Sequence, residues 1–473
     1  MKILYVSSEV APYAASGGLG DVIGALPACV SSRGNEVSVI SPLYSTMKEV
    51  YRNMLTHVAD ISFKYSWRET GASIYKICAS GVDYFFVENH YYFDRGRLYG
   101  EYDDAERFAF FSMAVIEFII QTNNNPDVIH ANDWQTAMVP VYLKTKYSGI
   151  EDLIAVKSVF TIHNIEYQGK FDPYILGDVF ALDNDHLGLM TYDGCINLMK
   201  AALLASDYVT TVSPNYATEL EYDFFAFGLS DIVKSIKHKM SGVINGIDYS
   251  AFSPNRDKDI YSPYHDRIVR AGKAKNKLAL CEELGLDTNP AIPLIVMITR
   301  LASQKGIDLF LHIANELLSR AVQIVVLGTG DADYERELSN LEKSHNNMRA
   351  LIKFDRALSK RLYAAADIFL MPSKSEPCGL AQMIACSYGT VPVVRNVGGL
   401  HDTIIPYPDA NSNGFRFDNY NAHDMLGTLI YAIDVYGNEK EWASLRRRAK
   451  TSKFLWDDSA EEYISIYTRI SNK

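Results

Sequence analysis

Cysteine is scarce in this sequence: its 473 residues include six cysteines, and no two of them form a CxxC pair. That scarcity argues against a disulfide scaffold and a structural zinc site, and it indicates a reducing compartment. Long hydrophobic runs are missing as well. One of the longest, residues 109–120, contains Glu117, and no window reaches the roughly 18 apolar residues of a membrane-spanning helix.

Two further absences narrow the class of protein. The chain enters its first apolar run at once, without the basic head, apolar segment and cleavage site of a secretory signal, so we expect a cytoplasmic protein. An excess of positive charge is also missing, because 57 Asp and Glu outnumber 46 Lys and Arg, for a formal net charge of −11. We therefore expect no nucleic acid as a partner, and any anionic ligand must be held by a few placed groups. No membrane partner is expected either, because the long apolar windows are missing.

What the sequence does contain is a repeated pattern. Short apolar runs rich in β-branched residues are each followed by a turn signal and a stretch with helical spacing, which is typical of the βα units of a parallel sheet. The predicted strands are residues 3–7, 37–41, 84–87, 128–131, 158–163 and 208–212 in the first half, and residues 294–299, 324–327, 351–354, 368–371 and 391–394 in the second.

A polar stretch with proline, residues 245–259, separates the two sets of strands and is interpreted as an interdomain linker. A chain of this length also has room for two or three domains, each with its own core. The sequence thus predicts an α/β protein with two doubly wound domains. Ligands of such sheets bind beyond the carboxyl ends of the strands, so the default site is the cleft between the domains.

A glycine-rich turn follows the first strand. Ser16, Gly17, Gly18 and Asp21 lie where the strand gives way to an apolar helical pattern. Backbone N–H groups of such a turn can face a phosphate or a sugar, and Asp21 at the helix start can accept sugar hydroxyls. The alternative is a tight strand-to-helix turn with no ligand.

Two other strands of the first half end in candidate functional residues. Asp133 and Trp134 follow residues 128–131, and a carboxylate beside an indole suits a sugar, whose hydroxyls and apolar face they can contact. Alternatively, Trp134 belongs to the core and Asp133 caps a helix. His163 ends the next strand at the same inferred edge of the sheet, although a lone histidine is more often structural.

Cations and a carboxylate follow strands of the second half. Arg300 and Lys305 lie in one strand-to-helix turn, and such a pair suits a diphosphate whose leaving charge must be stabilised; the alternative is a pair of solvated surface cations. Glu376 precedes a proline and Gly379 after another strand, so the backbone can approach a ligand closely there. Cys378 beside them suits buried packing better than a nucleophilic role.

Taken together, these segments resemble the bacterial glycogen and starch synthases, which are retaining glycosyltransferases of the GT-B architecture. The resemblance runs from residue 1 to about residue 467, and its markers are residues 16–22, 130–135, 163–169, 245–248, 300–306 and 376–380. It implies two Rossmann-like domains facing across a deep cleft. Residues 1–245 would form the acceptor-side domain, residues 246–452 the donor domain, and residues 453–473 a helix that crosses back to the first domain.

The resemblance also implies the reaction. Glucose is transferred from ADP-glucose, or less often UDP-glucose, to the non-reducing end of an α-1,4-glucan such as glycogen, starch or a maltooligosaccharide. Neither a metal nor an organic cofactor is expected. Because this family offers no convincing carboxylate behind the anomeric carbon, we favour front-face substitution over a double displacement.

Site residues follow from the same resemblance. It implies that Arg300 and Lys305 bind the donor diphosphate, that Glu376 orients the transferred glucose, and that His163 faces the anomeric centre and the 6-hydroxyl; these four are the predicted catalytic residues. Further donor-binding residues are Ser16, Gly17, Gly18, Asp21, Asn245, Phe354, Cys378, Gly379 and Leu380, with Phe354 as the aromatic that stacks on the base. The predicted acceptor-binding residues are Tyr99, Asp133 and Trp134.

Two positions depart from the family pattern. Ala15 stands where the family usually has a lysine, so the glycine-rich turn has no cation, and Ala381 replaces a common threonine. The Ala15 change keeps two alternatives open. One is a UDP-glucose-dependent glucosyltransferase for α-glucans or oligosaccharides. The other is a pseudoenzyme that binds glucan without turnover.

Overall fold

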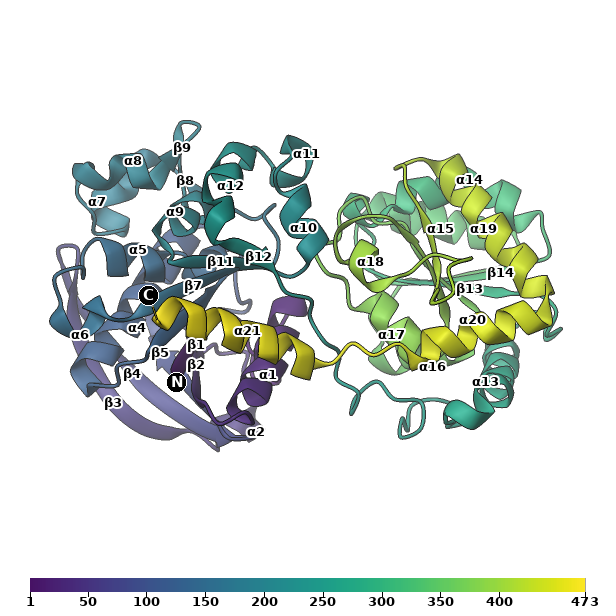
Figure 1. Cartoon of the computed structure of the whole chain (residues 1–473), viewed down its shortest axis with the longest axis horizontal. Helices are drawn as coiled ribbons and strands as arrows, with labels where there is room; N and C mark the ends of the chain where they lie inside the picture. The colour runs from purple at the N-terminus through teal and green to yellow at the C-terminus, as the bar shows by residue number, and fades with distance from the viewer. Residues whose placement is uncertain (473) are drawn as a thin grey trace. The chain divides into compact units, whose positions relative to one another are not determined.

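The computed structural model describes residues 1–472, which divide into two compact units (Figure 1). The first comprises Met1–Asn245 together with the segment that begins at Trp456, and the second comprises Gly246–Leu455. Between β12, which ends at Gly242, and the short 3₁₀ turn at Asp266–Ile268, the chain forms no helix or strand. This irregular stretch contains the predicted linker.

The first unit is built on a nine-stranded sheet in the order β12-β11-β7-β6-β1-β2-β5-β4-β3. Its strands are β1 (Lys2–Val6), β2 (Glu36–Pro42), β3 (Thr56–Tyr65), β4 (Arg68–Ala79), β5 (Val82–Glu88), β6 (Val128–Asn132), β7 (Lys157–Ile162), β11 (Tyr208–Thr211) and β12 (Met240–Gly242). The strands from β12 to β5 pair in parallel, whereas β3 and β4 pair antiparallel at the far edge. A separate small sheet joins β8 (Lys170–Phe171), β10 (Cys195–Asn197) and β9 (Thr191–Tyr192).

Helices cover both faces of the large sheet. The longer ones are α1 (Gly18–Ser31), α4 (Asp104–Thr122), α9 (Leu198–Ala205) and α21 (Trp456–Ser471). Shorter helices are α2 (Glu49–Arg52), α3 (His90–Phe93), α5 (Met138–Lys144), α6 (Glu151–Ile154), α7 (Leu176–Val179), α8 (Leu187–Met190), α10 (Pro214–Glu219), α11 (Asp223–Ala226) and α12 (Ser230–Ile236). The C-terminal helix α21 packs beside α1 and contributes to the core of this unit (Figure 1).

A buried polar network fixes α21 to the sheet. The hydroxyl of Tyr467 lies 2.7 Å from Nδ1 of His130 on β6 and 2.9 Å from the hydroxyl of Tyr5 on β1. The other ring nitrogen of His130 lies 2.5 Å from Oγ1 of Thr161 on β7. The last helix of the chain is therefore bonded directly to β1 and β6, and His130 connects the same network to β7.

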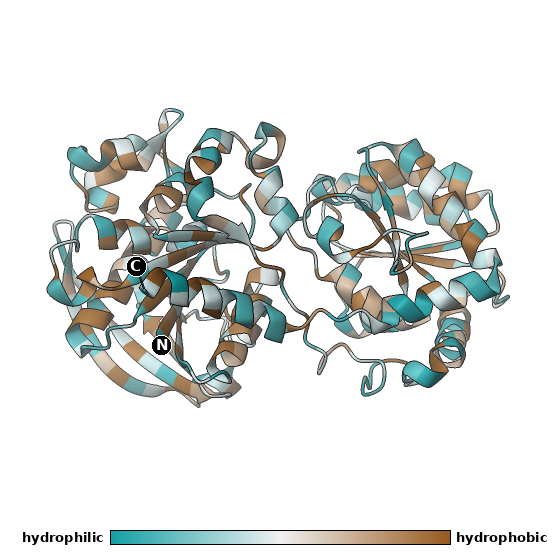
Figure 2. Cartoon of the chain, in the orientation of Figure 1, coloured by the Kyte–Doolittle hydropathy of each residue, from teal (hydrophilic) through white to brown (hydrophobic). Residues whose placement is uncertain are grey.

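The second unit contains a parallel six-stranded sheet in the order β15-β14-β13-β16-β17-β18. Its strands are β13 (Leu294–Ile298), β14 (Gln323–Leu327), β15 (Met348–Leu351), β16 (Ile368–Met371), β17 (Val391–Arg395) and β18 (Phe415–Phe417). Its helices are α13 (Val269–Leu284), α14 (Ile307–Leu318), α15 (Ala332–Ser344), α16 (Arg356–Ala365), α17 (Ala381–Ser387), α18 (Gly398–Thr403), α19 (Ala422–Gly437) and α20 (Glu439–Thr451). Figure 2 shows hydrophobic residues concentrated in the central strands and hydrophilic residues on the outward faces of the helices.

The predicted strands match observed ones within two residues at each end, with one exception. The strand expected at residues 351–354 is β15, which ends at Leu351. The chain turns there, because the N–H of Lys353 donates to the carbonyl of Leu351 at 2.9 Å. Phe354 therefore lies beyond the strand. Within residues 1–472, none of the helices combines the length and hydrophobicity needed to cross a bilayer.

Candidate active site

The carboxyl ends of β1, β6 and β7 share one edge of the first sheet, because these neighbouring strands are parallel. The residues predicted after them are thereby gathered: the glycine loop, here residues 15–18, follows β1, while Asp133 follows β6 and His163 follows β7. In the second unit, the loops after β13, β16 and β17 share an edge in the same way.

The glycine loop is organised by Glu9, which follows β1 and is 2% exposed. The backbone N–H groups of Ser16 and Gly17 donate to Glu9 Oε2 at 2.5 and 3.2 Å, and the Ser16 hydroxyl donates to Oε1 at 2.8 Å. Tyr99, from a distant segment, also donates to Oε1 at 2.8 Å, and its hydroxyl lies 2.6 Å from that of Ser16. Burial raises the pKa of Tyr99 above its usual range, so this donor keeps its proton.

Space is open on the outer side of the loop. A Cβ added to Gly17 or Gly18 would meet no atom within 4 Å, whereas one added to Gly20 would lie 2.4 Å from the Cβ of Ala15. Gly20 is therefore required by packing. Gly17 and Gly18 are not, which is expected of positions kept small for a ligand. Asp21 lies exposed in the first turn of α1.

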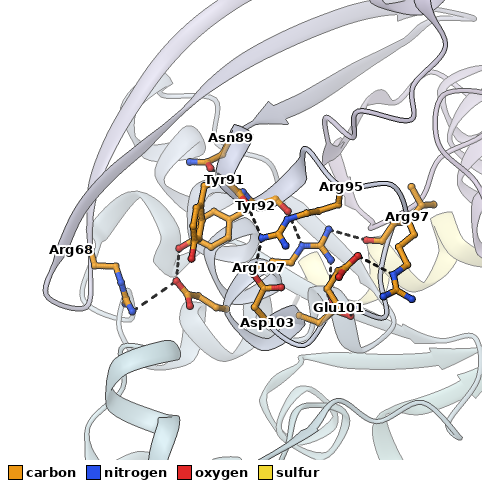
Figure 3. A network of polar contacts seen from close by, with 12 residues as sticks. Arg68, Asn89, Tyr91, Tyr92, Arg95, Arg97, Glu101, Asp103 and Arg107 are labelled. Atoms are coloured by element: carbon orange, nitrogen blue, oxygen red, sulfur yellow. Dashed lines mark hydrogen bonds and ion pairs between the residues drawn. The ribbon is translucent and has the colours of Figure 1, made fainter.

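A polar network braces the segment that carries Tyr99 (Figure 3). Arg107 on α4 is fully buried, forms an ion pair with Asp104, and donates to the carbonyls of Tyr92 at 2.7 Å and Leu98 at 3.2 Å. Asp104 in turn accepts the backbone N–H of Gly100 at 2.6 Å. The residues on both sides of Tyr99 are thus tied to α4, which fixes where its hydroxyl reaches.

Asp133 has an unusual backbone. Its φ of 59° and ψ of 175° fall in a region that costs a non-glycine residue about 1–3 kcal/mol and that is often found at functional sites. The conformation is held because Asp133 Oδ1 accepts the N–H of His163 at 2.8 Å, while the Asp133 N–H donates to the carbonyl of Thr161 at 3.0 Å. Burial raises the pKa of Asp133 to about 7. Asp133 stands at the N-cap position of the 3₁₀ helix Trp134–Thr136, but its side chain forms no capping hydrogen bond, so capping does not account for the carboxylate.

His163 is neutral, and its tautomer can be assigned. Its Nε2 lies 3.0 Å from Oδ1 of Asn132, whose own amide group donates to the carbonyls of Val6 and His130 at 3.2 and 3.1 Å. Because these two bonds identify the oxygen of Asn132, Nε2 of His163 is the donor. Burial lowers the pKa of His163 to about 3. The neutral ring leaves Nδ1 as an acceptor.

Trp134 lies half-buried against the first unit's core. Its ring packs edge-on to Phe108 with centroids 5.4 Å apart and is tilted against Phe171 at 6.0 Å. Gly169, with φ of 63°, approaches so closely that an added Cβ would lie 2.7 Å from the indole. The core alternative therefore describes how Trp134 packs, and the indole also supports the turn that follows His163.

In the second unit, three loops meet at the carboxyl edge of the sheet. A Cβ on Gly306 would lie 2.1 Å from the carbonyl oxygen of Pro372, and one on Gly398 would lie 2.0 Å from that of Glu376. Both glycines have positive φ, 72° and 46°. The N–H of Lys374 donates to the carbonyl of Gln304 at 2.8 Å, and that of Gly399 to Glu376 at 3.1 Å. Backbone contact of this kind fixes the loops that carry the predicted cations and carboxylate.

Lys305 and Glu376 form an ion pair at this edge. Nζ of Lys305 lies 2.7 Å from Oε2 of Glu376, with the two side chains 16% and 9% exposed. The hydroxyl of Ser373 donates to the same oxygen at 2.9 Å. Arg300 is exposed, and its guanidinium has no hydrogen bond or ion pair with any residue of the described chain. One cation is therefore held by the carboxylate, while the other is free for a ligand.

The remaining predicted residues have distinct surroundings. Cys378 is buried and Gly379 has a φ of 74°, while the backbone of Leu380 leads into α17. Phe354 is 90% exposed, so its ring is available for stacking. Asn245 is buried, and its Oδ1 has no hydrogen-bond partner within the described part of the chain.

Sequence reasoning missed Glu9, Asn132 and Ser373. Glu9 has the same signal as Asp133, an acidic residue just past a predicted parallel strand, and that rule applied to every strand would have found it. Asn132 and Ser373 act through side-chain contacts to His163 and Glu376, and neither residue type carries a sequence signal for such a contact. Residues 1–472 contain no group of three His, Cys, Asp or Glu side chains suited to a metal ion.

Comparison with known proteins gives a family match in each of the two units. The family described as Starch synthase catalytic domain matches residues 2–235, and the family described as Glycosyl transferases group 1 matches residues 284–451. A protein named Glycogen synthase from Streptococcus mutans serotype c is 43% identical over 477 residues, covering 100% of both chains. Another of that name, from Clostridium botulinum, is 43% identical over 478 residues with the same coverage.

A solved structure is similar over the whole chain. The catalytic domain of Starch Synthase IV from Arabidopsis thaliana bound to ADP and acarbose superposes with a TM-score of 0.90 at 33% identity, covering 100% of this chain and 99% of that one. The fold class and the glycosyltransferase assignment predicted from the sequence are confirmed. With full-length identity at this level, the chain belongs to the family of glycogen and starch synthases, glycosyltransferases of the GT-B fold.

Proposed function

We propose that this protein transfers glucose from ADP-glucose to the non-reducing end of an α-1,4-glucan, with retention of configuration. The observation that carries the proposal is the second unit's edge, where Lys305 is paired with Glu376 while Arg300 is unengaged. A free guanidinium and a held ammonium on the same loop after β13 match the charge of a nucleoside diphosphate leaving group. The related Arabidopsis structure, which holds ADP and acarbose, supports the same two ligand classes.

Donor recognition is assigned to the second unit. Arg300 and Lys305 bind the diphosphate, and Glu376 accepts hydroxyl hydrogen bonds from the glucose while Ser373 keeps its carboxylate oriented. The backbone of Cys378, Gly379 and Leu380 lines the same loop. Phe354 stacks on the base, for which its 90% exposure leaves the ring available. One donor contact comes from the first unit, where the unpaired Oδ1 of Asn245 accepts a hydrogen bond from the donor.

The first unit contributes groups suited to neutral sugars. Neutral His163 accepts a hydrogen bond from a sugar hydroxyl at Nδ1, and its backbone faces the anomeric centre. Asp133 accepts hydrogen bonds from hydroxyls of the glucan acceptor, and Asp21 accepts them from hydroxyls of the sugar donor. The open side of Gly17 and Gly18 lets a pyranose ring come close to the backbone. Trp134 acts on the acceptor side by supporting the turn after His163.

Retention is achieved by front-face substitution. The bond between the anomeric carbon and the phosphate oxygen breaks while the acceptor's 4-hydroxyl oxygen bonds to the same face, and the leaving phosphate oxygen takes the hydroxyl proton. Arg300 and Lys305 hold the charge that develops on the diphosphate. Glu376 is engaged by Lys305 and Ser373, which suits an orienting role better than that of a nucleophile. Trapping a covalent glucosyl ester on Glu376 or Asp21 would overturn this mechanism.

The decisive experiment measures nucleoside diphosphate release with glycogen as acceptor, comparing ADP-glucose with UDP-glucose and including Ala15→Lys. Ala15 is exposed, so a lysine there has room to extend. Turnover with ADP-glucose supports the proposal. Preference for UDP-glucose moves the assignment to the donor variant, and glucan binding without any release moves it to a pseudoenzyme.

A further inference from the structure

The glycine loop does not offer all of its backbone N–H groups to a ligand. The N–H groups of Ser16 and Gly17 both donate to Glu9 Oε2, so the inner side of the loop already surrounds an anion that belongs to the protein. The N–H of Gly20 is also engaged, with the carbonyl of Gly17 at 3.1 Å. A phosphate could take the N–H groups of Ser16 and Gly17 only by displacing a buried carboxylate.

Glu9 itself is held firmly. Its backbone is fixed by Ser7, whose hydroxyl donates to the Glu9 carbonyl at 2.7 Å and accepts the Glu9 N–H at 3.2 Å. Its carboxylate receives four donors, two from the backbone and two from the hydroxyls of Ser16 and Tyr99. All four donors are neutral. Because three of them belong to Ser16 and Gly17, the geometry of the loop depends on this one side chain.

We propose that Glu9 is the positioning residue of the glycine loop, holding it so that Gly17 and Gly18 face sugar hydroxyls and withholding two amides from the donor phosphates. The proposal rests on the proposed function and deepens it. Because Ala15 supplies no cation, diphosphate recognition falls to Arg300 and Lys305. Tyr99 helps to position the glycine loop, since its hydroxyl donates to Glu9 and lies 2.6 Å from the hydroxyl of Ser16.

The segment around Tyr99 is held in place by buried polar contacts, which keeps its hydroxyl close to Glu9. A tyrosine on a free loop would lose side-chain and backbone entropy each time it bound Glu9. Arg107 and Asp104 remove that cost by fixing Leu98 and Gly100 on either side of it, and the network in Figure 3 extends this support to Arg95 and Asp103, 2.9 Å apart. A fully buried arginine is thereby connected to the glycine loop through Tyr99 and Glu9.

The test compares Glu9→Ala and Glu9→Gln with Glu49→Gln, a control on the exposed helix α2. Amide hydrogen exchange of the peptide containing residues 15–18 reports loop order, and titration with ADP reports diphosphate binding; neither measurement needs turnover. ADP release at varied ADP-glucose and maltooligosaccharide concentrations then separates kcat from KM. Thermal unfolding of each variant verifies that it is folded.

For Glu9→Ala we expect exchange at residues 15–18 to rise about tenfold or more, as for lost hydrogen bonds. The KM values for ADP-glucose and for maltooligosaccharide should rise by a similar factor. The Kd for ADP should stay within about twofold of that of the parent protein. Glu9→Gln, which keeps an acceptor oxygen, should lie in between, and Glu49→Gln should match the parent.

Three results would overturn the proposal: unchanged exchange in a folded Glu9→Ala variant, a matching loss of ADP affinity, or equal KM in the parent and the variants. Should Glu9→Ala fail to fold, Glu9→Gln decides by the same criteria. A parent protein that releases no ADP refutes the proposed function instead, and the exchange and titration results still decide the role of Glu9.

Discussion

Breaking the pair of Lys305 and Glu376 should cost activity much more than stability. Removing one group that stabilises developing charge typically lowers kcat by about 10²–10³, or about 3–4 kcal/mol. The cost to folding is smaller, about 1–3 kcal/mol, because Glu376→Gln leaves an ammonium that is 16% exposed beside a neutral amide. We therefore expect Glu376→Gln and Lys305→Ala each to lower kcat by about 10²–10³-fold while the protein remains folded.

The pair also predicts how the two changes combine. Independent losses would multiply to about 10⁴–10⁶-fold, but residues in direct contact that act as a unit are not additive. The double variant should lie within about tenfold of the slower single variant. ADP release with saturating glycogen measures kcat, and Glu316→Gln, on the exposed face of α14, is the control. Unchanged rates in the single variants, or losses that multiply in full, would refute the reasoning.

Three further predictions follow from packing and burial. Gly20→Ala should lower the Tm because its Cβ would lie 2.4 Å from that of Ala15. Gly17→Ala should leave the Tm unchanged and raise the KM for the sugar substrates by about ten- to a hundredfold. A Gly17→Ala variant with a lowered Tm and an unchanged KM would contradict a ligand role for Gly17. The folded pKa of Asp133, raised to about 7, means that the folded state binds its proton more tightly than the unfolded state, so stability falls as pH rises from about 4 to 7. In urea unfolding measured from about pH 4 to 7, Asp133→Asn should flatten the dependence of stability on pH. An unchanged slope would contradict the raised pKa of Asp133. Tyr467→Phe leaves His130 Nδ1 without its partner and should lower the unfolding free energy by about 1–3 kcal/mol, against no change for the exposed Tyr102→Phe.

Much of the fold could be predicted because parallel strands buried on both faces are nearly continuous apolar runs. The antiparallel strands β3 and β4 were missed for the complementary reason. Along β3, burial alternates towards its end, with Ile61, Phe63 and Tyr65 buried and the residues between them exposed, so no continuous run exists. A search for alternation as well as for runs would have identified this hairpin. The shift at β15 arose from Ile352, an apolar residue that follows the strand.

Some site residues could be predicted because they directly follow parallel strands, whereas the residues that contact them could not be predicted from the sequence. Asp133, His163, Arg300 and Glu376 each follow a parallel strand, and parallel strands bring such positions to one edge. The partners that tune them come from distant positions. The bond from Tyr99 to Glu9 spans 90 residues, and no local pattern encodes a contact of that range.

Each unit captures a carboxylate just past a strand of its parallel sheet, but with different donors. Glu9 is held by neutral N–H and hydroxyl groups, whereas Glu376 is held by the ammonium of Lys305 and the hydroxyl of Ser373. Only the second arrangement adds positive charge, so the diphosphate should be recognised there and the sugar hydroxyls at the first. It follows that restoring a cation with Ala15→Lys should change donor affinity less than Lys305→Ala does. A larger effect of Ala15→Lys in ADP titrations would mean that the glycine loop, and not the loop after β13, governs diphosphate binding.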